Sequence, residues 1–242
     1  MQTFLLAAGL GTRLKPLTDT MPKALVPVKG QPLLKHIAQK LIQSGAKRIV
    51  VNVHHFANQV NDYINAQKWD IPIITSDETE MLLDTGGGLR KAQTLFTPEA
   101  PILIHNVDIL SNANLQELYE VHKGHDVTLL VSQRDTFRYL LFNDEMRLVG
   151  WTNTKTGEVR TPYPNLDAEK CHRYAFSGIH IFSPSLFPLM REWPEKFSIM
   201  DFYLSICDKV HIHGATQEGL QLLDVGKCDT LATAEKFVEE LK

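Results

Sequence analysis

The sequence has few of the features that mark secreted or membrane proteins. Its three cysteines, Cys171, Cys207 and Cys228, are odd in number and form no Cys-x-x-Cys pair, which argues against a disulfide framework or a cysteine-bound zinc. No apolar run approaches the length of a membrane span, and the apolar start at 4–8 is too short for a signal peptide. We therefore expect a protein of the reducing cytoplasm without a membrane partner.

An excess of basic residues is also missing. The 25 Lys and Arg residues against 28 Asp and Glu residues give a formal charge of −3, so no bulk positive field attracts a nucleic acid. Any recognition of phosphate must be local. Hydrophobic residues make up 43% of the 242 residues, and the 14 Gly and 12 Pro are scattered, which excludes collagen-like and low-complexity chains. We expect one packed domain over 1–242.

What is present is a βαβ pattern. Short apolar runs alternate with longer amphipathic segments, which predicts an α/β fold with a largely parallel sheet covered by helices on both faces. A strand over 3–8 leads into a Gly-rich loop, and a helix that begins at Pro32 ends at Gly45. The pattern predicts further strands at 48–53, 71–75, 102–107 and 127–132, with helices at 58–66, 87–95 and 115–123.

The pattern changes after Arg134. The segments 139–142 and 147–149 predict an antiparallel hairpin, and the polar segment 152–173, with its Gly and Pro residues, predicts a loop or an irregular ribbon. We expect this loop to border a substrate pocket. The remaining pattern predicts strands at 176–182, 210–213 and 220–225, with helices at 199–208 and 228–241.

The most informative segment directly follows the first strand. Gly9 and Gly11 allow backbone N–H groups to approach an anion, and Arg13 and Lys15 add positive charge, which predicts a phosphate-binding loop. A dinucleotide fingerprint would need a third glycine at Leu14, and no Gly-Lys-Ser/Thr follows for a P-loop. Taken alone, the loop is equally well explained as a structural turn.

Together with the segment Pro22-Lys23-Ala24-Leu25-Val26-Pro27, this loop resembles the nucleotidyltransferase superfamily that makes nucleotide sugars. The similarity continues in the expected order through Asp84-Thr85-Gly86-Gly87-Gly88, Asn106-Val107-Asp108, Phe176-Ser177-Gly178-Ile179 and Asp224-Val225-Gly226. The forms at 84–88 and 176–179 look most like the N-acetylmuramate-1-phosphate uridylyltransferase branch.

The resemblance implies a fold and an activity. The fold is a Rossmann-like three-layer α/β/α arrangement with a mainly parallel mixed sheet and a small β excursion. A nucleotide-binding part covers about 1–133 and a sugar-binding part about 134–227. The implied reaction is Mg²⁺-dependent transfer of a nucleotidyl group from a nucleoside triphosphate to a sugar 1-phosphate, in which pyrophosphate is released.

The resemblance also implies site residues. Arg13 would bind the β- and γ-phosphates, and Lys23 would reach the α-phosphate and the incoming sugar phosphate. The implied nucleotide-binding residues are Ala8, Gly9, Gly11, Thr12, Arg13, Lys23, Thr85, Gly86 and Gly87, and the implied sugar-binding residues are Asn106, Ser177 and Gly178. Because the segment 84–88 opens a helix, we expect its amide groups to read a base edge or the ribose.

Two carboxylates are candidate metal ligands. Asp108 and Asp224 each follow an apolar run, so both are expected at the carboxyl ends of strands, where open α/β sheets bind ligands. Mg²⁺ is typically held by one or two protein carboxylates together with substrate phosphates. The alternative for each Asp is a cap on the following helix.

The base and the sugar stay open in the sequence. Met81, with Glu80 before it, occupies the position where the family commonly has a base-contacting Glu or Gln, and Val107 replaces a usual Gly. UTP is favoured, and GTP with mannose or heptose 1-phosphate is the alternative. A non-catalytic nucleotide sensor and a nicotinamide dehydrogenase are the rivals from other classes.

Two histidine pairs are interpreted as ordinary side chains. Adjacent residues at a strand end, such as His54 and His55, point to opposite faces, and we read His211 and His213 in the same way as surface or core histidines. We expect a monomer or small homo-oligomer.

Overall fold

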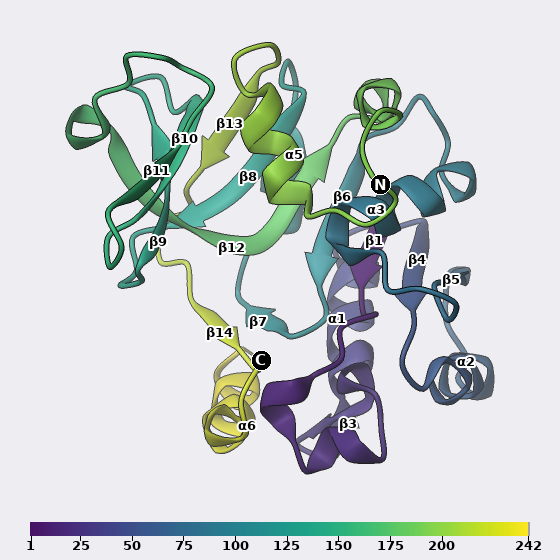
Figure 1. Ribbon diagram of the computed structural model, residues 1–242. Helices are drawn as coiled ribbons and strands as arrows, with labels where there is room; N and C mark the ends of the chain where they lie inside the picture. The colour runs from purple at the N-terminus through teal and green to yellow at the C-terminus, as the bar shows by residue number, and fades with distance from the viewer. Residues whose placement is uncertain (242) are drawn as a thin grey trace.

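The computed structural model describes residues 1–241 and is built around one mixed ten-stranded sheet (Figure 1). The strands run in the order β11-β10-β9-β12-β6-β1-β4-β5, and β12 also pairs with β8, which pairs with β13. The strands are β1 (Gln2–Leu6), β4 (Arg48–Val53), β5 (Ile73–Asp77), β6 (Ile102–Asn106), β8 (Val127–Ser132), β9 (Arg138–Phe142), β10 (Leu148–Asn153), β11 (Glu158–Arg160), β12 (His172–Phe182) and β13 (Ile212–Ala215).

The core of the sheet is parallel. Strands β5, β4, β1 and β6 run in one direction, and β8 and β13 are also parallel to each other. Strand β12 is antiparallel to both β6 and β8, so β8 runs in the same direction as β6. The pairing of β12 with β6 makes the sheet continuous between the segments 1–133 and 134–227.

Helices cover both faces because every central strand is apolar on both sides. Neighbouring residues alternate between two buried clusters: Phe4 and Val50 pack on one face, and Leu5 and Val51 pack on the other. On the face of Leu5 lie α1 (Leu33–Gln43), α2 (Ala57–Ala66), α4 (Leu115–Val121) and α6 (Leu231–Glu240), and on the face of Phe4 lie α3 (Asp84–Lys91) and α5 (Ile199–Ile206). The predicted three-layer α/β/α fold is confirmed.

The segment 152–173 is more ordered than we predicted. Strand β10 continues to Asn153, β11 pairs with it from Glu158 to Arg160, and β12 already begins at His172. All three residues of β11 are exposed, so this edge strand shows no apolar alternation in the sequence. Of the two predicted alternatives, an irregular ribbon describes 158–160, where a loop is wrong, whereas 161–171 contains no strand.

Other boundaries shifted by a few residues, and short elements were missed. The strand predicted at 71–75 is β5, the strand predicted at 210–213 is β13, and the helix predicted from Gly87 begins at Asp84. The missed elements include the 3₁₀ helix η6 (Pro184–Met190), the small pair β2 (Pro27–Val28) and β3 (Gln31–Pro32), and β7 (Ile109–Ser111), which pairs with β14 (Leu222–Asp224). Within 1–241, no helix is long and apolar enough to cross a bilayer.

Candidate active site

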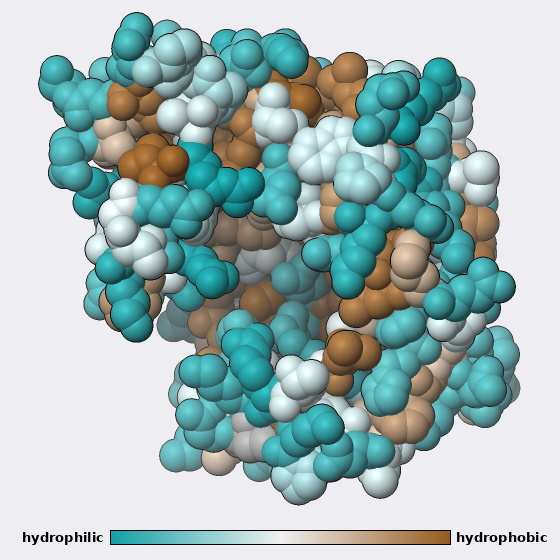
Figure 2. All heavy atoms as spheres, in the orientation of Figure 1, coloured by the Kyte–Doolittle hydropathy of each residue, from teal (hydrophilic) through white to brown (hydrophobic). Residues whose placement is uncertain are grey.

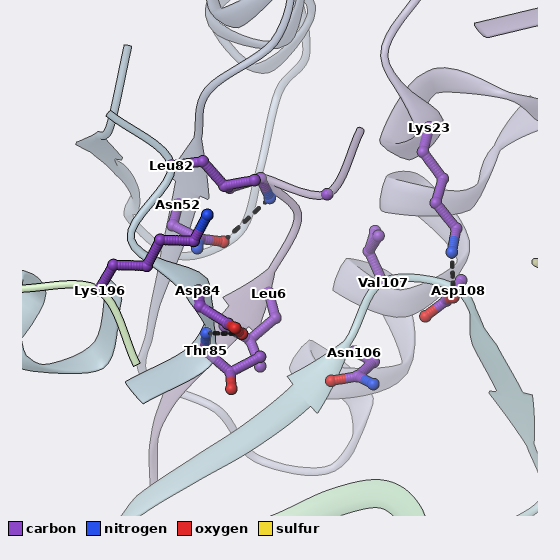
Figure 3. A pocket seen from close by; sticks show the side chains of 12 residues that line it. Leu6, Lys23, Asn52, Leu82, Asp84, Thr85, Asn106, Val107, Asp108 and Lys196 are labelled. Atoms are coloured by element: carbon purple, nitrogen blue, oxygen red, sulfur yellow. Dashed lines mark hydrogen bonds and ion pairs between the residues drawn. The ribbon is translucent and has the colours of Figure 1, made fainter. Parts of the chain in front are cut away.

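A pocket of about 370 Å³ opens at the carboxyl ends of β1, β4 and β6 (Figure 3). The molecular surface is hollowed at the centre of the face seen in Figure 2. The pocket is lined by Leu6, Ala8, Gly9, Lys23, Asn52, Leu82, Asp84, Thr85, Asn106, Val107, Asp108 and Lys196. It lies where the sequence predicted a ligand for an open α/β sheet.

The predicted site residues divide into two groups. Six of them line the pocket: Ala8, Gly9, Lys23, Thr85, Asn106 and Asp108. The others lie outside this lining: Gly11, Thr12, Arg13, Gly86, Gly87, Ser177, Gly178 and Asp224. Several residues of the second group contact residues of the first group.

The loop after β1 is positioned by a buried amide. The side-chain oxygen of Asn52 accepts hydrogen bonds from the backbone N–H groups of Ala7 and Ala8, at 2.7 and 3.2 Å. Asn52 in turn donates to the carboxylate of Glu78 at 2.8 Å, and that carboxylate also accepts from the N–H of Leu83. Burial raises the pKa of Glu78, and its hydrogen bonds oppose this shift. These hydrogen bonds hold the loop so that Gly9 lines the pocket. A Cβ added to Gly9 would meet no described atom within 4 Å outside its chain neighbours.

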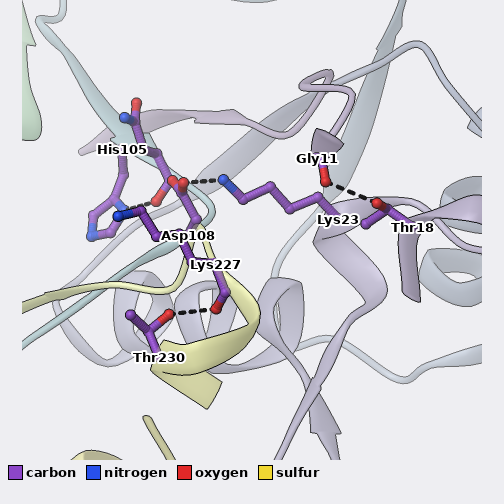
Figure 4. Close-up of polar contacts among 8 residues, drawn as sticks. Gly11, Thr18, Lys23, His105, Asp108, Lys227 and Thr230 are labelled. Atoms are coloured by element: carbon purple, nitrogen blue, oxygen red, sulfur yellow. Dashed lines mark hydrogen bonds and ion pairs between the residues drawn. The ribbon is translucent and has the colours of Figure 1, made fainter. Parts of the chain in front are cut away.

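The second glycine of the loop has a packing role. Gly11 has φ 64°, and a Cβ there would lie 2.8 Å from Thr18 and 3.0 Å from the Cβ of Lys23. The hydroxyl of Thr18 donates to the carbonyl of Gly11 (Figure 4). Gly11 therefore lets the loop close tightly beside the 3₁₀ helix η3 (Lys23–Leu25), which carries Lys23.

Lys23 and Asp108 form an ion pair at one wall of the pocket (Figures 3 and 4). The two side chains are only 12% and 14% exposed. Asp108 lies in the turn between β6 and β7, so the next element is a strand and a helix-capping role for Asp108 is wrong. A largely buried ammonium and carboxylate beside the end of β6 fit the predicted roles of charge stabilisation.

The small sheet brings the second carboxylate to the first. Asp224 is level with Ile109 in the β14–β7 pair, and the N–H of Val225 donates to the carbonyl of Asp108 at 2.8 Å. Partial desolvation and the neighbouring Asp108 carboxylate raise the pKa of Asp224, whereas Lys23, Arg13 and Arg134 act in the opposite direction. The tertiary structure thus joins two residues that are 116 positions apart in the chain.

Arg13 lies at the same place. A Cβ on Gly226 would be 2.6 Å from a carboxylate oxygen of Asp224 and 2.7 Å from a guanidinium nitrogen of Arg13. The bare backbone of Gly226 therefore admits both charged groups. Lys23, Arg13, Asp108 and Asp224 form one cluster beside the pocket.

The donor set of this cluster fits a hard divalent cation. Two carboxylates supply oxygen ligands, and the Lys23 ammonium already lies against Asp108 as a cation would. Two protein ligands leave room for substrate phosphates and water, which is the usual arrangement for Mg²⁺.

The glycines of the 84–88 segment do not present free amides to the pocket. The N–H groups of Gly86 and Gly87 donate to the carbonyl of Phe197, at 2.9 and 3.3 Å. A Cβ on either glycine would lie 2.3 Å from the Phe197 ring or the Glu195 carbonyl. The Thr85 hydroxyl accepts the N–H of Ile199 at 2.9 Å. Our expectation that these amides read the base is corrected: the glycines admit the 195–197 segment.

That segment brings a cation that the sequence reading missed. Lys196 lines the pocket from the side of Asn52 and Asp84, and Figure 3 shows it away from Lys23 and Asp108. Asn52 was missed as well, although its place at the end of a buried strand is the same signal that singled out Asp108. Lys196 has no such signal, because tertiary contacts of the segment 190–197, among them the packing of Gly86 and Gly87 against 195–197, bring it to the pocket.

Gly178, a predicted sugar-binding residue, lies against Asn106. Gly178 has φ 79°, and a Cβ there would lie 2.8 Å from the side-chain nitrogen of Asn106, which lines the pocket. The register of β12 against β8 shifts between Phe176 and His180, so Gly178 lies at a β-bulge. The hydroxyl of Ser177 is buried and accepts the N–H of Ile179, so it faces the bulge.

A second pocket of about 420 Å³ adjoins this strand. It is lined in part by Phe176, Arg134, Trp151 and Arg160, the last two from β10 and β11. The guanidinium of Arg134 donates to the carbonyl of Phe176, and Arg160 pairs with Asp201 at 2.9 Å. The segment that we predicted to border a substrate pocket thus contributes to a pocket wall.

The residues that depart from the family pattern lie partly inside and partly outside the pocket lining. Met81 and Glu80 are exposed and lie outside the pocket lining, whereas Leu82 and Val107 belong to it. No acidic or amide side chain from 80–81 therefore lines the pocket.

Comparisons with known proteins show the family of the chain. Residues 2–139 match the family model described as nucleotidyl transferase. The chain is 31% identical over 97% of its length to the N-acetylmuramate alpha-1-phosphate uridylyltransferase of Caulobacter vibrioides, of which it covers 96%. It is 34% identical over 52% of its length to a mannose-1-phosphate guanyltransferase of Hypocrea jecorina, of which it covers 35%.

A solved structure shows the same fold over the whole chain. A putative glucose-1-phosphate thymidylyltransferase from Bacillus anthracis superposes with a TM-score of 0.82 at 16% identity, covering 100% of this chain and 96% of that one. The motifs, the fold and the family match agree, and the chain belongs to the nucleotidyl transferase family, as the sequence predicted.

Proposed function

We propose that this enzyme transfers a nucleotidyl group from UTP to a sugar 1-phosphate and releases pyrophosphate. The observation that carries the proposal is the cluster of Lys23, Arg13, Asp108 and Asp224 beside a pocket at the carboxyl edge of the sheet. A triphosphate needs cations around it and a loop that approaches it closely. Gly9 lines the pocket without a side chain, and Lys196 adds a cation away from Lys23 and Asp108 (Figure 3). We also propose that the protein is located in the cytoplasm.

The reaction needs no general base. A phosphate monoester is mostly ionised at neutral pH, because its second pKa is about 6. The oxygen of the sugar phosphate attacks the α-phosphorus, a new P–O bond forms, and the bond to the β-phosphate oxygen breaks, so pyrophosphate leaves with the electron pair. Lys23 and Arg13 hold the phosphates and neutralise their charge. Mg²⁺ held by Asp108 and Asp224 would supply further charge neutralisation.

The choice of UTP rests on the comparison that covers the chain. The uridylyltransferase of Caulobacter vibrioides matches over 97% of the chain, whereas the guanyltransferase of Hypocrea jecorina matches over 52%. The first match therefore spans nearly the whole chain, whereas the second spans about half of it. GTP with mannose 1-phosphate is the second candidate, because identity in the shared part is 34%.

The base assignment is tested by release of pyrophosphate with Mg²⁺ from UTP, GTP, CTP and dTTP, each with N-acetylmuramate, glucose and mannose 1-phosphate. We expect kcat/KM to be at least about 10-fold higher for UTP than for the other nucleotides, which is the scale of one discriminating contact. Equal or faster turnover with GTP for every sugar phosphate would contradict the assignment.

The cluster is tested by Asp108→Asn and Asp224→Asn. Each substitution keeps size and polarity but removes a negative charge, so each should lower kcat by about 10²-fold or more. Since both carboxylates act through one cation, the double variant should lose far less than the sum of the single losses in activation free energy.

Asp77→Asn is the matched control, because Asp77 is an exposed carboxylate at the end of β5 outside the pocket lining. It should keep the full rate. Normal turnover of Asp224→Asn at limiting Mg²⁺, with an inactive Asp108→Asn, would show that Asp224 is no part of the site.

A further inference from the structure

Three histidines from separate parts of the sequence meet at the edge of the sheet opposite the pocket. His125 precedes β8, His211 precedes β13, and His213 lies on β13. Strands β8 and β13 are parallel neighbours (Figure 1), so these residues gather at the amino-terminal ends of the two strands. The pocket lies at the carboxyl ends of strands that run in the same direction. The cluster is therefore separate from the nucleotidyl transfer site.

The imidazoles are close enough to share one ion. Each ring offers one nitrogen, and the three nitrogens all lie within 4.8 Å of one another. The Nδ1 atoms of His125 and His211 are 3.3 Å apart. Two nitrogens bound tetrahedrally to one zinc at 2.0–2.1 Å are about 3.3 Å apart, so this pair already has the spacing of two zinc ligands.

The third ring is held nearby and has an unused nitrogen. The ring of His213 stacks on that of His125 with centroids 4.4 Å apart, and the Nδ1 atom of His213 is buried without a hydrogen-bond partner among the described residues. Stacked rings cannot both point a lone pair at one ion, so His213 must turn about its side-chain bonds to bind. All three residues are partly exposed, which leaves room for this rotation.

The backbone of the cluster is fixed by the fold. The carboxylate of Asp126 accepts the N–H of His211 at 2.8 Å, and the carbonyl of His211 accepts the N–H groups of Asp126 and Val127. His213 is paired with Thr128 in the sheet and bridges to Arg147 on its other side. A site built on strand ends loses little freedom on binding an ion.

The protonation state also suits a ligand role. Burial is the main cause that lowers the pKa of His125 and of His213, and the neighbouring imidazoles are the second cause. Neutral imidazoles are the form that binds a metal.

We propose that His125, His211 and His213 form a binding site for a first-row transition-metal ion such as Zn²⁺, with water in the fourth position. Imidazole ligands select Zn²⁺, Ni²⁺ or Cu²⁺ over Mg²⁺, so the two ions of the protein occupy different sites. An ion held here ties the start of β8 to β13 and stabilises the fold.

The test uses the full chain without a polyhistidine tag, stripped with a chelator and kept in excess Mg²⁺. Titration with Co²⁺, followed by visible absorption, reports a tetrahedral histidine site, and calorimetry with Zn²⁺ gives the stoichiometry. We expect one ion per chain and, at about 100-fold excess over Kd, a rise in melting temperature of roughly 5 °C.

His125→Ala and His213→Ala should each weaken Zn²⁺ binding by about 100-fold or more, since loss of even an indirect partner costs 10–100-fold. His172→Ala is the matched control, because His172 is an exposed histidine outside the cluster, and it should bind normally. Both cluster variants should keep the metal-free melting temperature and the turnover with Mg²⁺. No saturable binding, or equal binding by all three variants, would overturn the proposal.

Discussion

At the scale of single residues, the glycines of the two glycine-rich segments, 9–11 and 86–88, have different physical roles. A Cβ on Gly9 would have no atom within 4 Å, and Gly9 lines the pocket. A Cβ on Gly86 would lie 2.3 Å from the ring of Phe197, and the N–H of Gly86 is bonded to the carbonyl of Phe197. The first glycine therefore leaves space for a ligand, and the second leaves space for the protein itself.

This difference predicts opposite effects of the same substitution. Gly9→Ala should leave the melting temperature unchanged and lower kcat/KM about 10-fold or more, because the methyl group keeps phosphates from the loop. Gly86→Ala should lower the free energy of unfolding by about 1–3 kcal/mol, as expected for overpacking. Thermal melts and steady-state kinetics of both variants check this. A stable Gly86→Ala protein with weakened nucleotide binding would restore the role in base recognition.

At the scale of elements, one arginine on α3 holds the segment that carries Lys196. The guanidinium of Arg90 donates to the carbonyls of Met190, Trp193 and Pro194, each at 2.8 Å. It also lies 5.1 Å from the centre of the Phe197 ring. Since carbonyls without a donor are costly when buried, Arg90 determines the path of 190–197 between η6 and α5.

Arg90→Ala should therefore affect both stability and nucleotide binding. We expect the free energy of unfolding to fall by about 2–4 kcal/mol, because several charge-assisted hydrogen bonds and a cation–π contact are lost. The KM for the nucleotide should rise more than the KM for the sugar phosphate, since Lys196 loses its position. Lys91→Ala, at the neighbouring position of α3, is the control and should change neither quantity. An unchanged nucleotide KM in Arg90→Ala would separate Lys196 from the site.

At the scale of the whole molecule, three buried histidines make stability depend on pH. Burial lowers the pKa of His105 and of His122 to about 4 and that of His180 to about 3, from 6.5. The folded pKa values lie below the unfolded value, so the unfolded chain binds more protons between about pH 6.5 and 4. The free energy of unfolding is highest above this window and falls as the pH drops through it. Burial raises the pKa of Glu78, which acts in the opposite direction.

His180 isolates the histidine part of this dependence. It packs against the rings of Phe176 and Tyr203, and both of its ring nitrogens are buried without a hydrogen-bond partner among the described residues. Each such histidine costs about 2 kcal/mol at pH 5, where the unfolded imidazole is mostly protonated. His180→Phe should therefore reduce the loss of stability between about pH 7.5 and pH 5 by about 2 kcal/mol, measured by denaturant unfolding. His172 is exposed, so His172→Ala serves as the control and should leave the loss of stability between these pH values unchanged.

The sequence alone determined the family, the α/β class and most central elements. These depend on local signals in the sequence. A buried strand appears as an apolar run, a helix appears as apolar residues repeated every three to four positions, and the loop at 9–13 is marked by its glycines. It also singled out Lys23 and Asp108, which the structure brings together at the pocket. The sequence did not predict edge strand β11, because its residues are all exposed. It did not predict η6 and β7 either, because both are too short for a periodic signal.

Only the tertiary structure decided which residues meet. Asp224 reaches Asp108 because β14 pairs with β7, and Lys196 reaches the pocket because Gly86 and Gly87 admit 195–197. His125 joins His211 and His213 because β8 and β13 are neighbours. Contacts between distant segments follow from strand order and from the space that packing leaves, and neither is encoded in a local run of residues.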